Sequence, residues 1–276
     1  MRIAFQGVTG AYSEAAARRF NPAADVLARP SFEQVFSAVA EQQATHGILP
    51  IENTIGGTIH RNYDLLLEHD LPIVGEVKLA VTHHLIVLQG TTIDQVRRIY
   101  SHPQGLAQCE RYLRTLKNVE IVATYDTAGS AKMIKDGNLT DTAAIASERA
   151  AQAFGLEILE SGIQDYANNF TRFLLIGRET VPLGEPDKTT IVFTVANEAG
   201  ALFKALSVFA LREIDMTKLE SRPIPDRPFE YLFYADLAIN REEFRCARAL
   251  MHLAEFAPSV RTLGSYPSWR EIEQPQ

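Results

Sequence analysis

Short apolar runs alternate with segments of helical periodicity over the first two thirds of the chain. Runs such as Ile3–Gln6 and Thr171–Ile176 have the length and composition of buried strands. This alternation is typical of α/β proteins, in which helices cover mostly parallel sheets. The predicted strands are too many for one sheet, so we expect two lobes with a cleft between them. Lobe 1 is expected at about residues 1–80 and 160–180, and lobe 2 at about 81–159.

The pattern changes after Thr180–Asp187, a stretch with prolines, a glycine and acidic residues that is predicted to be a linker. A β-branched strand, Thr189–Ala196, and an amphipathic helix, Gly200–Leu211, follow it. With these two elements as the first, the predicted order after the linker is strand, helix, two strands, helix and strand. This is the order of a ferredoxin-like βαββαβ unit. We therefore expect an α/β chain with two domains, at residues 1–180 and 188–266.

Charge and cysteine content narrow the classes of function. The net charge is −7 and no basic stripe is present, so a nucleic-acid partner is not expected. Cys109 and Cys246 lie far apart and predict neither a disulfide framework nor a cysteine metal site. The adjacent His83 and His84 face opposite sides of a strand and cannot hold one metal together. The chain begins with a strand-like Arg2–Phe5 and has no apolar run long enough to span a membrane, so we expect a cytoplasmic protein without a membrane partner.

The loop Gln6–Ser13 connects the first predicted strand to the first predicted helix. Gly10 lets the backbone turn tightly and approach a ligand. The free N–H groups at the start of the following helix favour an anion. We therefore predict substrate contacts from Thr9, Gly10, Tyr12 and Ser13. The alternative is a tight turn in which Ser13 caps the helix. The loop lacks the GxGxxG pattern, so NAD binding is not supported.

The loop Leu49–Thr58 carries more polar groups than a purely structural turn needs. Asn53 and Thr54 supply neutral donors, and Gly57 permits a close approach of the backbone to a ligand. Loops of this kind bind oxyanions without adding charge. We therefore predict that this loop contacts the substrate.

Two further loops, SHPQGLAQC and DTAGS, each join a strand to a helix. In the first, a proline suits the first helical turn, and His102 or Ser101 lies near the helix cap. Gln108 is placed one turn into a helix predicted over Gly105–Leu116. In the second loop, Thr127 opens the next predicted helix. The alternative for both loops is a simple helix cap.

The stretch Asn168–Phe173 places a hydroxyl and a guanidinium at the start of a core strand. Because side chains alternate along a strand, Thr171 and Phe173 face one way and Arg172 faces the other. Polar groups at the end of a core strand lie where an open α/β sheet holds its ligand. The alternative is a strand start with one solvated arginine.

The motifs GVTGAYSEAA, LPIENTIGG, SHPQGLAQC, YDTAGSA and NNFTRFLLIG occur in one order along the chain. On these motifs the chain resembles the prephenate dehydratase family. The resemblance implies a two-lobed catalytic domain like the type II periplasmic binding proteins. It implies conversion of prephenate to phenylpyruvate, water and CO₂ in L-phenylalanine biosynthesis, without a metal or an organic cofactor. Catalytic residues are then expected at Thr171, Asn53, Gln108 and Arg172. Substrate-binding residues are expected at Thr9, Gly10, Tyr12, Ser13, Thr54, Gly57, Ser101, His102, Thr127 and Phe173.

The C-terminal unit resembles an ACT regulatory domain, with NEAGALFKAL and LESRP where that family has its effector-binding motifs. The resemblance implies allosteric regulation by L-phenylalanine, bound at a subunit interface of a homodimer or homotetramer. Backbone N–H groups after Gly200 can receive a carboxylate. The expected effector-binding residues are Asn197, Gly200, Ala201, Leu202, Glu220, Ser221 and Arg222. The alternative for these residues is a helix cap and an exposed strand end.

Two other functions stay open. The stretch IENTIGGTIHRNYDLL is closer to the arogenate dehydratase branch, so conversion of arogenate to L-phenylalanine, or dual specificity, is the alternative. A non-catalytic amino-acid-binding regulator would show eroded cleft loops, whereas Thr171, Asn53 and Gln108 are all present.

The chemistry of prephenate fits these residue types. Loss of CO₂ and hydroxide makes the ring aromatic, which supplies the driving force without a redox cofactor. Neutral donors such as Thr171, Asn53 and Gln108 can hydrogen-bond the leaving oxygen as charge develops on it. Arg172 and helix N-termini can hold the carboxylates. We therefore expect a mostly neutral, partly dry cleft.

Overall fold

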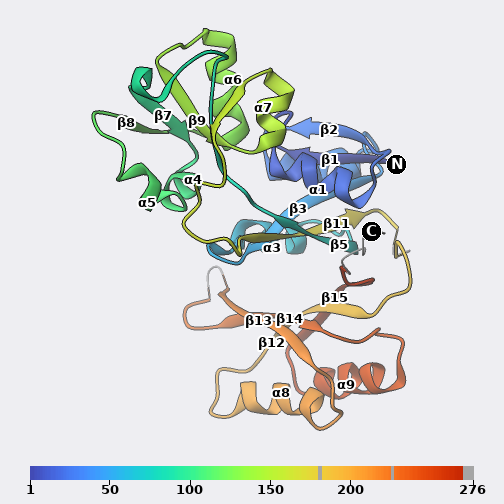
Figure 1. Ribbon diagram of the computed structural model, residues 1–276. Coiled ribbons are helices and arrows are strands. Elements are labelled where there is room, and N and C mark those ends of the chain that lie inside the picture. Colours follow the sequence, from blue (N-terminus) through green and yellow to red (C-terminus); the bar gives the residue numbers. More distant parts are fainter. Residues whose placement is uncertain (180–181, 225–226, 270–276) are drawn as a thin grey trace, which may run out of the picture. The chain divides into compact units, whose positions relative to one another are not determined.

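The structure is a computed structural model that describes residues 1–179, 182–224 and 227–269 (Figure 1). The chain divides into two compact units, one of Met1–His69 and Val77–Leu174, the other of Asp70–Glu76 and Leu175–Gln276. The predicted domain boundary at residue 180, with residue 181 of the predicted linker, lies outside the described residues.

The first sheet has the strand order β2-β1-β3-β11-β5, and the short β4 pairs with β3. Strand β1 runs parallel to both β2 and β3. Helices α1 and α2 pack on β1, and α3 packs on β3. These strands are β1 (Arg2–Gln6), β2 (Asp25–Arg29), β3 (His46–Asn53), β4 (Gly57–Thr58), β5 (Ile73–Ala80) and β11 (Phe170–Gly177). The helices are α1 (Tyr12–Phe20), α2 (Phe32–Ala40) and α3 (His60–Glu68).

The second sheet has the order β10-β6-β9-β7-β8. Strand β7 is parallel to β8 and β9, whereas β6 is antiparallel to β9 and β10. The reversed strand, β6, is the one through which the chain enters this lobe. These strands are β6 (His84–Val87), β7 (Arg98–Ser101), β8 (Glu120–Ala123), β9 (Thr142–Ala146) and β10 (Glu157–Glu160). The lobe also contains the helices η1 (Ile93–Gln95), α4 (Pro103–Ala107), α5 (Glu110–Leu113), α6 (Thr127–Gly137) and α7 (Glu148–Phe154).

One helix prediction in this lobe is wrong. A single helix was expected over Gly105–Leu116, but the structure has α4 and α5 with a break at Gln108 and Cys109. Cys109 has φ −120° and ψ 22°, outside the helical region. Both residues at the break are buried, so long-range packing overrides the helical pattern of the sequence here.

The C-terminal unit has the element order β12, α8, β13, β14, α9 and β15, which confirms the predicted ferredoxin-like βαββαβ unit. Its antiparallel sheet has the order β13-β14-β12-β15, and α8 and α9 lie together on one face of it (Figure 1). A core including Phe193, Phe209 and Leu253 fills the space between sheet and helices. The bounds are β12 (Lys188–Thr194), α8 (Ala201–Ala210), β13 (Met216–Pro223), β14 (Tyr231–Leu237), α9 (Phe244–Ala254) and β15 (Ser259–Tyr266).

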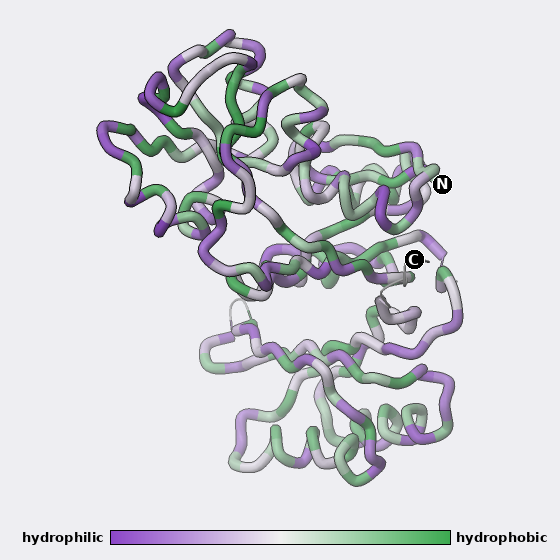
Figure 2. Tube along the Cα trace, in the orientation of Figure 1, coloured by the Kyte–Doolittle hydropathy of each residue, from purple (hydrophilic) through white to green (hydrophobic). Residues whose placement is uncertain are grey.

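The burial pattern explains why these segments form sheets. Strand β9 is buried along its whole length, and Ile3, Ala4 and Phe5 of β1 are almost fully buried. Helices cover both strands, so continuous apolar runs are what this architecture requires. Figure 2 shows hydrophilic residues along the outer loops of the second lobe, away from the buried strands.

Candidate active site

A cavity of about 390 Å³ lies in the first unit and is lined by residues of both lobes. It brings together residues that are far apart in the sequence, from the loop after β1 to the start of β11. Eight of the residues expected at the active site line it: Tyr12, Ser13, Asn53, His102, Gln108, Thr127, Thr171 and Phe173. The other lining residues are Gln6, Phe32, Pro50, Ile59, Val81, His83, Gln104, Gly105, Tyr125 and Asp126.

Three buried amides form a closed ring of hydrogen bonds beside this cavity. The Asn53 Nδ2 group donates to Asn169 Oδ1 at 2.7 Å, and Asn169 Nδ2 donates to Gln108 Oε1 at 3.0 Å. Gln108 Nε2 closes the ring by donating to Asn53 Oδ1 at 3.3 Å. All three side chains are at least nine-tenths buried, so each amide depends on the other two for its hydrogen bonds.

The orientation of this ring is fixed by the backbone. The N–H groups of Ile55 and Gly56 both donate to one atom of Asn53, at 3.0 and 2.7 Å. Because backbone N–H groups can only donate, that atom is the oxygen and the other atom is the NH₂ group. The carbonyl of Phe170, which can only accept, lies 3.2 Å from the same NH₂ group and requires the same orientation.

The hydroxyl of Thr171 is attached to this ring as an acceptor. Asn53 Nδ2 lies 3.0 Å from Thr171 Oγ1 and donates to it. Among the described residues, no acceptor for the Thr171 hydroxyl hydrogen is recorded. Thr171 is buried and lines the cavity, so its O–H bond is available to a molecule bound there.

The alternation predicted for β11 holds. Thr171 and Phe173 are buried and line the cavity, whereas Arg172 is half-buried and is not among the lining residues. The lining residues include no arginine or lysine. A catalytic role for Arg172 therefore stays a prediction. Its position near the start of β11, outside the cavity lining, suits a side chain that supports the loop leading into this strand.

His83 and Tyr12 extend the polar network into the second lobe. His83 Nε2 lies 2.8 Å from Gln108 Oε1, and its Nδ1 lies 3.2 Å from Tyr12 Oη. The Tyr12 hydroxyl also lies 2.5 Å from the carbonyl of Thr82. Burial lowers the pKa of His83 below its usual value and raises the pKa of Tyr12 far above its usual range, so both groups are uncharged near neutral pH.

Three helices begin at the cavity wall. Helix α1 has Ala11 as its N-cap residue, with no side-chain cap, and Ser13 lies inside the first turn rather than at the cap. His102 caps α4 by accepting from Gln104 N–H at its Nδ1. Asp126 caps α6, where its carboxylate accepts from Gly129 N–H. The start of α1 leaves backbone N–H groups that can receive an anion, whereas side chains already cap α4 and α6.

Five expected binding residues lie outside the lining. Thr9 is exposed, and Gly57 is exposed with a positive φ of 77°. Thr54 Oγ1 donates to the carbonyl of Asn168 and accepts from Phe170 N–H, which joins the loop after β3 to the start of β11. The remaining two, Ser101 and Gly10, are held by packing. The substrate contacts of these five residues stay predictions.

Gly10 and Ser101 contact backbone in the second lobe. A Cβ on Gly10 would lie 2.7 Å from Ala150 Cα. The carbonyl of Gly10 accepts a hydrogen bond from Ser147 Oγ. Its N–H donates to Glu14, which Arg149 also contacts at 2.9 Å. Ser101 is buried and donates to the carbonyl of Ile145 at 2.7 Å. These contacts hold the walls of the cavity in place.

Sequence patterns missed Asn169 and His83. Asn169 stands two residues before Thr171 and is 1% exposed, yet its amide links Asn53 to Gln108. For His83 the sequence indicates only that it cannot share a metal ion with His84. Among the described residues, no group of three or more His, Cys, Asp or Glu side chains is placed to hold a metal ion. Cys109 is buried and burial raises the pKa of its thiol to about 12, which suits a packing role.

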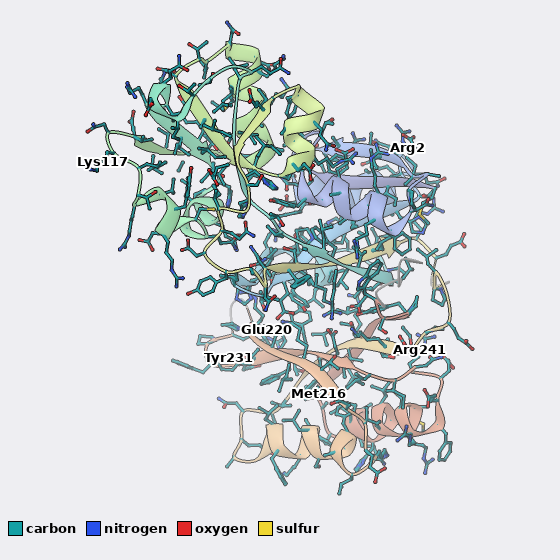
Figure 3. All side chains as sticks on the ribbon, in the orientation of Figure 1. Arg2, Lys117, Met216, Glu220, Tyr231 and Arg241 are labelled. Atoms are coloured by element: carbon teal, nitrogen blue, oxygen red, sulfur yellow. The ribbon has the colours of Figure 1, made fainter. Side chains whose placement is uncertain are left out.

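The expected effector-binding residues gather at two places in the C-terminal unit. Gly200 is the N-cap of α8 with φ 81°, a conformation that glycine adopts without strain, and Ala201 and Leu202 form the first turn. Asn197 is exposed just before this turn. Glu220, Ser221 and Arg222 lie on β13, and Figure 3 shows Glu220 and Tyr231 at the same end of the β13–β14 pair.

The fold and the cavity define a class of protein: a two-lobed α/β domain whose cavity is lined mostly by uncharged polar and apolar side chains, followed by a ferredoxin-like unit. Residues 3–181 match the prephenate dehydratase family model. The chain is 49% identical over 278 residues to arogenate dehydratase/prephenate dehydratase 2, chloroplastic, of Arabidopsis thaliana, covering 97% of this chain and 73% of that protein. The chain belongs to the prephenate dehydratase family and is an enzyme, a carbon–oxygen lyase.

Two solved structures share the fold of this chain. The structure titled prephenate dehydratase in complex with L-Phe from Arthrobacter aurescens has a TM-score of 0.89 at 29% identity, covering 100% of this chain and 92% of that one. A second structure, titled GqqA, a novel type of quorum quenching acylase, has a TM-score of 0.89 at 36% identity and covers 98% of each chain. The predicted α/β fold and family are confirmed.

We predict that Asn53→Asp lowers kcat by about a hundredfold or more, because the donor to Thr171 is replaced by a second oxygen. The change is isosteric, so the melting temperature separates a damaged fold from a damaged site. Steady-state formation of phenylpyruvate from prephenate is the measurement.

The matched control is Asn168→Asp, because Asn168 is exposed and its side chain is outside the amide ring. This control should keep the activity of the unchanged enzyme. Equal rates for Asn53→Asp and the unchanged enzyme would show that the ring does not orient Thr171.

Proposed function

We propose that this lyase converts prephenate to phenylpyruvate, with the cavity around Thr171 as its active site. The ring carboxylate leaves as CO₂, and its bonding electrons move through the diene as the C–O bond at the ring hydroxyl breaks. The leaving oxygen takes up one proton to become water. The products are phenylpyruvate, CO₂ and water.

The Thr171 hydroxyl is the single observation that supports this proposal most strongly. Its oxygen accepts from Asn53, so its hydrogen is directed away from the ring and can donate to the leaving hydroxyl. Negative charge grows on that oxygen only as the C–O bond breaks, so this hydrogen bond is stronger in the transition state than in the ground state.

The absence of arginine and lysine from the lining residues suits decarboxylation. A cation held against the ring carboxylate would stabilise the charge that must leave as CO₂. The start of α1, which has no side-chain cap, provides backbone N–H groups for the other carboxylate without placing a cationic side chain in the cavity. Binding of the dianion and loss of CO₂ are then compatible.

Arogenate is the second candidate substrate, and one observation favours it. Arogenate carries an ammonium where prephenate carries a ketone, and the carboxylate of Asp126 lines the cavity. A carboxylate near the side chain of the substrate would attract an ammonium. Conversion of arogenate to L-phenylalanine, or activity on both substrates, is therefore the alternative.

We predict that Thr171→Val lowers kcat for prephenate by about a hundredfold or more, while Thr171→Ser keeps most of it. Valine keeps the shape of the side chain and removes the hydroxyl, whereas serine keeps the hydroxyl. Turnover of prephenate and arogenate should be measured for all three proteins. Normal turnover by Thr171→Val would sink the site assignment, and a strong preference of the unchanged enzyme for arogenate would replace prephenate as the substrate.

We propose that the C-terminal unit binds L-phenylalanine and regulates the enzyme as part of a homodimer or homotetramer. The N–H groups after Gly200 suit the carboxylate of an amino acid, and Glu220 suits its ammonium. Strand β13 lies at the edge of its sheet, where a second subunit can complete a binding site. Regulation requires that L-phenylalanine bind one conformation more tightly than another.

We also propose a reducing, cytoplasmic location, which the two buried free cysteines support. In the part of the chain that the structure describes, no helix has the length and apolar character needed to cross a membrane.

We predict that Glu220→Gln weakens binding of L-phenylalanine by about tenfold or more, because a charged acceptor for the ammonium is lost. Calorimetric titration of the full-length protein measures this affinity. Turnover without L-phenylalanine should not change. Glu255→Gln is the control, since Glu255 is exposed at the end of α9 and far along the chain from the expected site. Equal affinity of both variants would contradict the assignment.

A further inference from the structure

His83 is buried at the start of the second lobe and contacts the amide ring from outside. It is 2% exposed, and its Nε2 lies 2.8 Å from Gln108 Oε1. The same oxygen already accepts from Asn169 Nδ2 at 3.0 Å. His83 therefore faces the one ring member that comes from the break between α4 and α5.

The ring determines which nitrogen of His83 carries the proton. The backbone fixes Asn53, Asn53 fixes Asn169, and Asn169 requires an oxygen on the side of Gln108 that it faces. That oxygen can only accept, so His83 Nε2 must be protonated. In the neutral imidazole Nδ1 is then bare, and it lies 3.2 Å from the hydroxyl of Tyr12.

The opposite orientation of the Gln108 amide is unfavourable at both of its contacts within the ring. If Gln108 turned its amide over, its oxygen would face Asn53 Oδ1 and its NH₂ group would face Asn169 Nδ2. Each of these pairs joins two donors or two acceptors in a buried place, which is costly.

We propose that His83 is a positioning residue: its Nε2–H holds the Gln108 amide in one orientation, and the amide ring passes this constraint to the Thr171 hydroxyl. The role rests on the proposed function, because the hydroxyl that it orients is the donor to the leaving oxygen. His83 acts through Gln108 and Asn53. Nδ1 is unprotonated in this arrangement and lies 3.2 Å from Tyr12 Oη, whose hydrogen is donated to the carbonyl of Thr82.

His84 offers a comparison for the positioning role proposed for His83. The next residue is also a histidine, but it is half-buried, does not line the cavity and opens β6. Its Nδ1 is a buried atom that has no hydrogen-bond partner among the described residues. The two imidazoles thus provide a matched pair, one attached to the ring and one not.

The test compares His83→Leu, His83→Gln and His84→Leu in the full-length enzyme. His83→Leu removes the Nε2–H donor, and kcat for prephenate should fall by up to about a hundredfold. KM should change much less, because the substrate-holding groups remain. His83→Gln places an N–H group where Nε2 stood and should restore most of kcat. His84→Leu should leave kcat unchanged.

A second measurement requires neither a variant nor an activity assay. Nitrogen-15 NMR of the unchanged protein near neutral pH should show His83 with a protonated Nε2 and an unprotonated Nδ1. The other tautomer would overturn the proposal even if the enzyme is fully active. Unchanged kcat in His83→Leu, or failure of His83→Gln to restore kcat in a folded protein, would also overturn it.

The two measurements separate this inference from the proposed function. If prephenate is not a substrate but the tautomer is as stated, the orientation of the ring stands and the reaction is different. If prephenate is turned over but the tautomer is reversed, the reaction stands and His83 has no positioning role.

Discussion

The N–H groups of Ile55 and Gly56 donate to Oδ1 of Asn53, and the orientation of the whole site depends on these two bonds. Their positions are fixed because the loop after β3 folds back over the side chain of Asn53, the last residue of that strand. Once the oxygen of Asn53 is fixed, its NH₂ group has to face Asn169 and Thr171. The backbone, through one amide, thereby keeps the hydroxyl hydrogen of Thr171 from pointing at the NH₂ group of Asn53.

The polar groups that line the cavity are mostly uncharged. Its lining contains imidazoles, hydroxyls and amides, one carboxylate, and neither arginine nor lysine. Burial keeps His83 and Tyr12 uncharged, so they add directional hydrogen bonds without adding net charge. A reaction that expels CO₂ and hydroxide from a dianion requires this combination. It needs donors for one leaving group and no strong cation at the other.

Much of this could be predicted from the sequence, because the informative groups lie in local patterns. Alternating apolar runs and helices predicted the α/β lobes, and the period of two along β11 correctly separated Thr171 and Phe173 from Arg172. The donor-rich loop after β3 predicted Asn53, and the resemblance of SHPQGLAQC to the family motif implied Gln108. In each case the signal is contained within a few residues.

The parts that escaped prediction depend on contacts between distant segments. Asn169 is meaningful only because Asn53 and Gln108 meet on either side of it. The break that divides the predicted helix Gly105–Leu116 follows from burial of Gln108 and Cys109 against other elements. For His83 the sequence excludes only a metal ion shared with His84, since it does not show that an amide lies opposite the His83 Nε2. Helical periodicity and residue type carry no information about such partners.

The coupling between Asn53 and Thr171 is the property that most directly tests whether the backbone-fixed amide orients the Thr171 hydroxyl. A double-mutant cycle with Asn53→Asp and Thr171→Val measures it through kcat for prephenate. If Asn53 acts through Thr171, adding Asn53→Asp to Thr171→Val should lower kcat by no more than about threefold further. If the two single effects multiply in the double variant, the two residues act independently and the orienting role of the amide ring is contradicted.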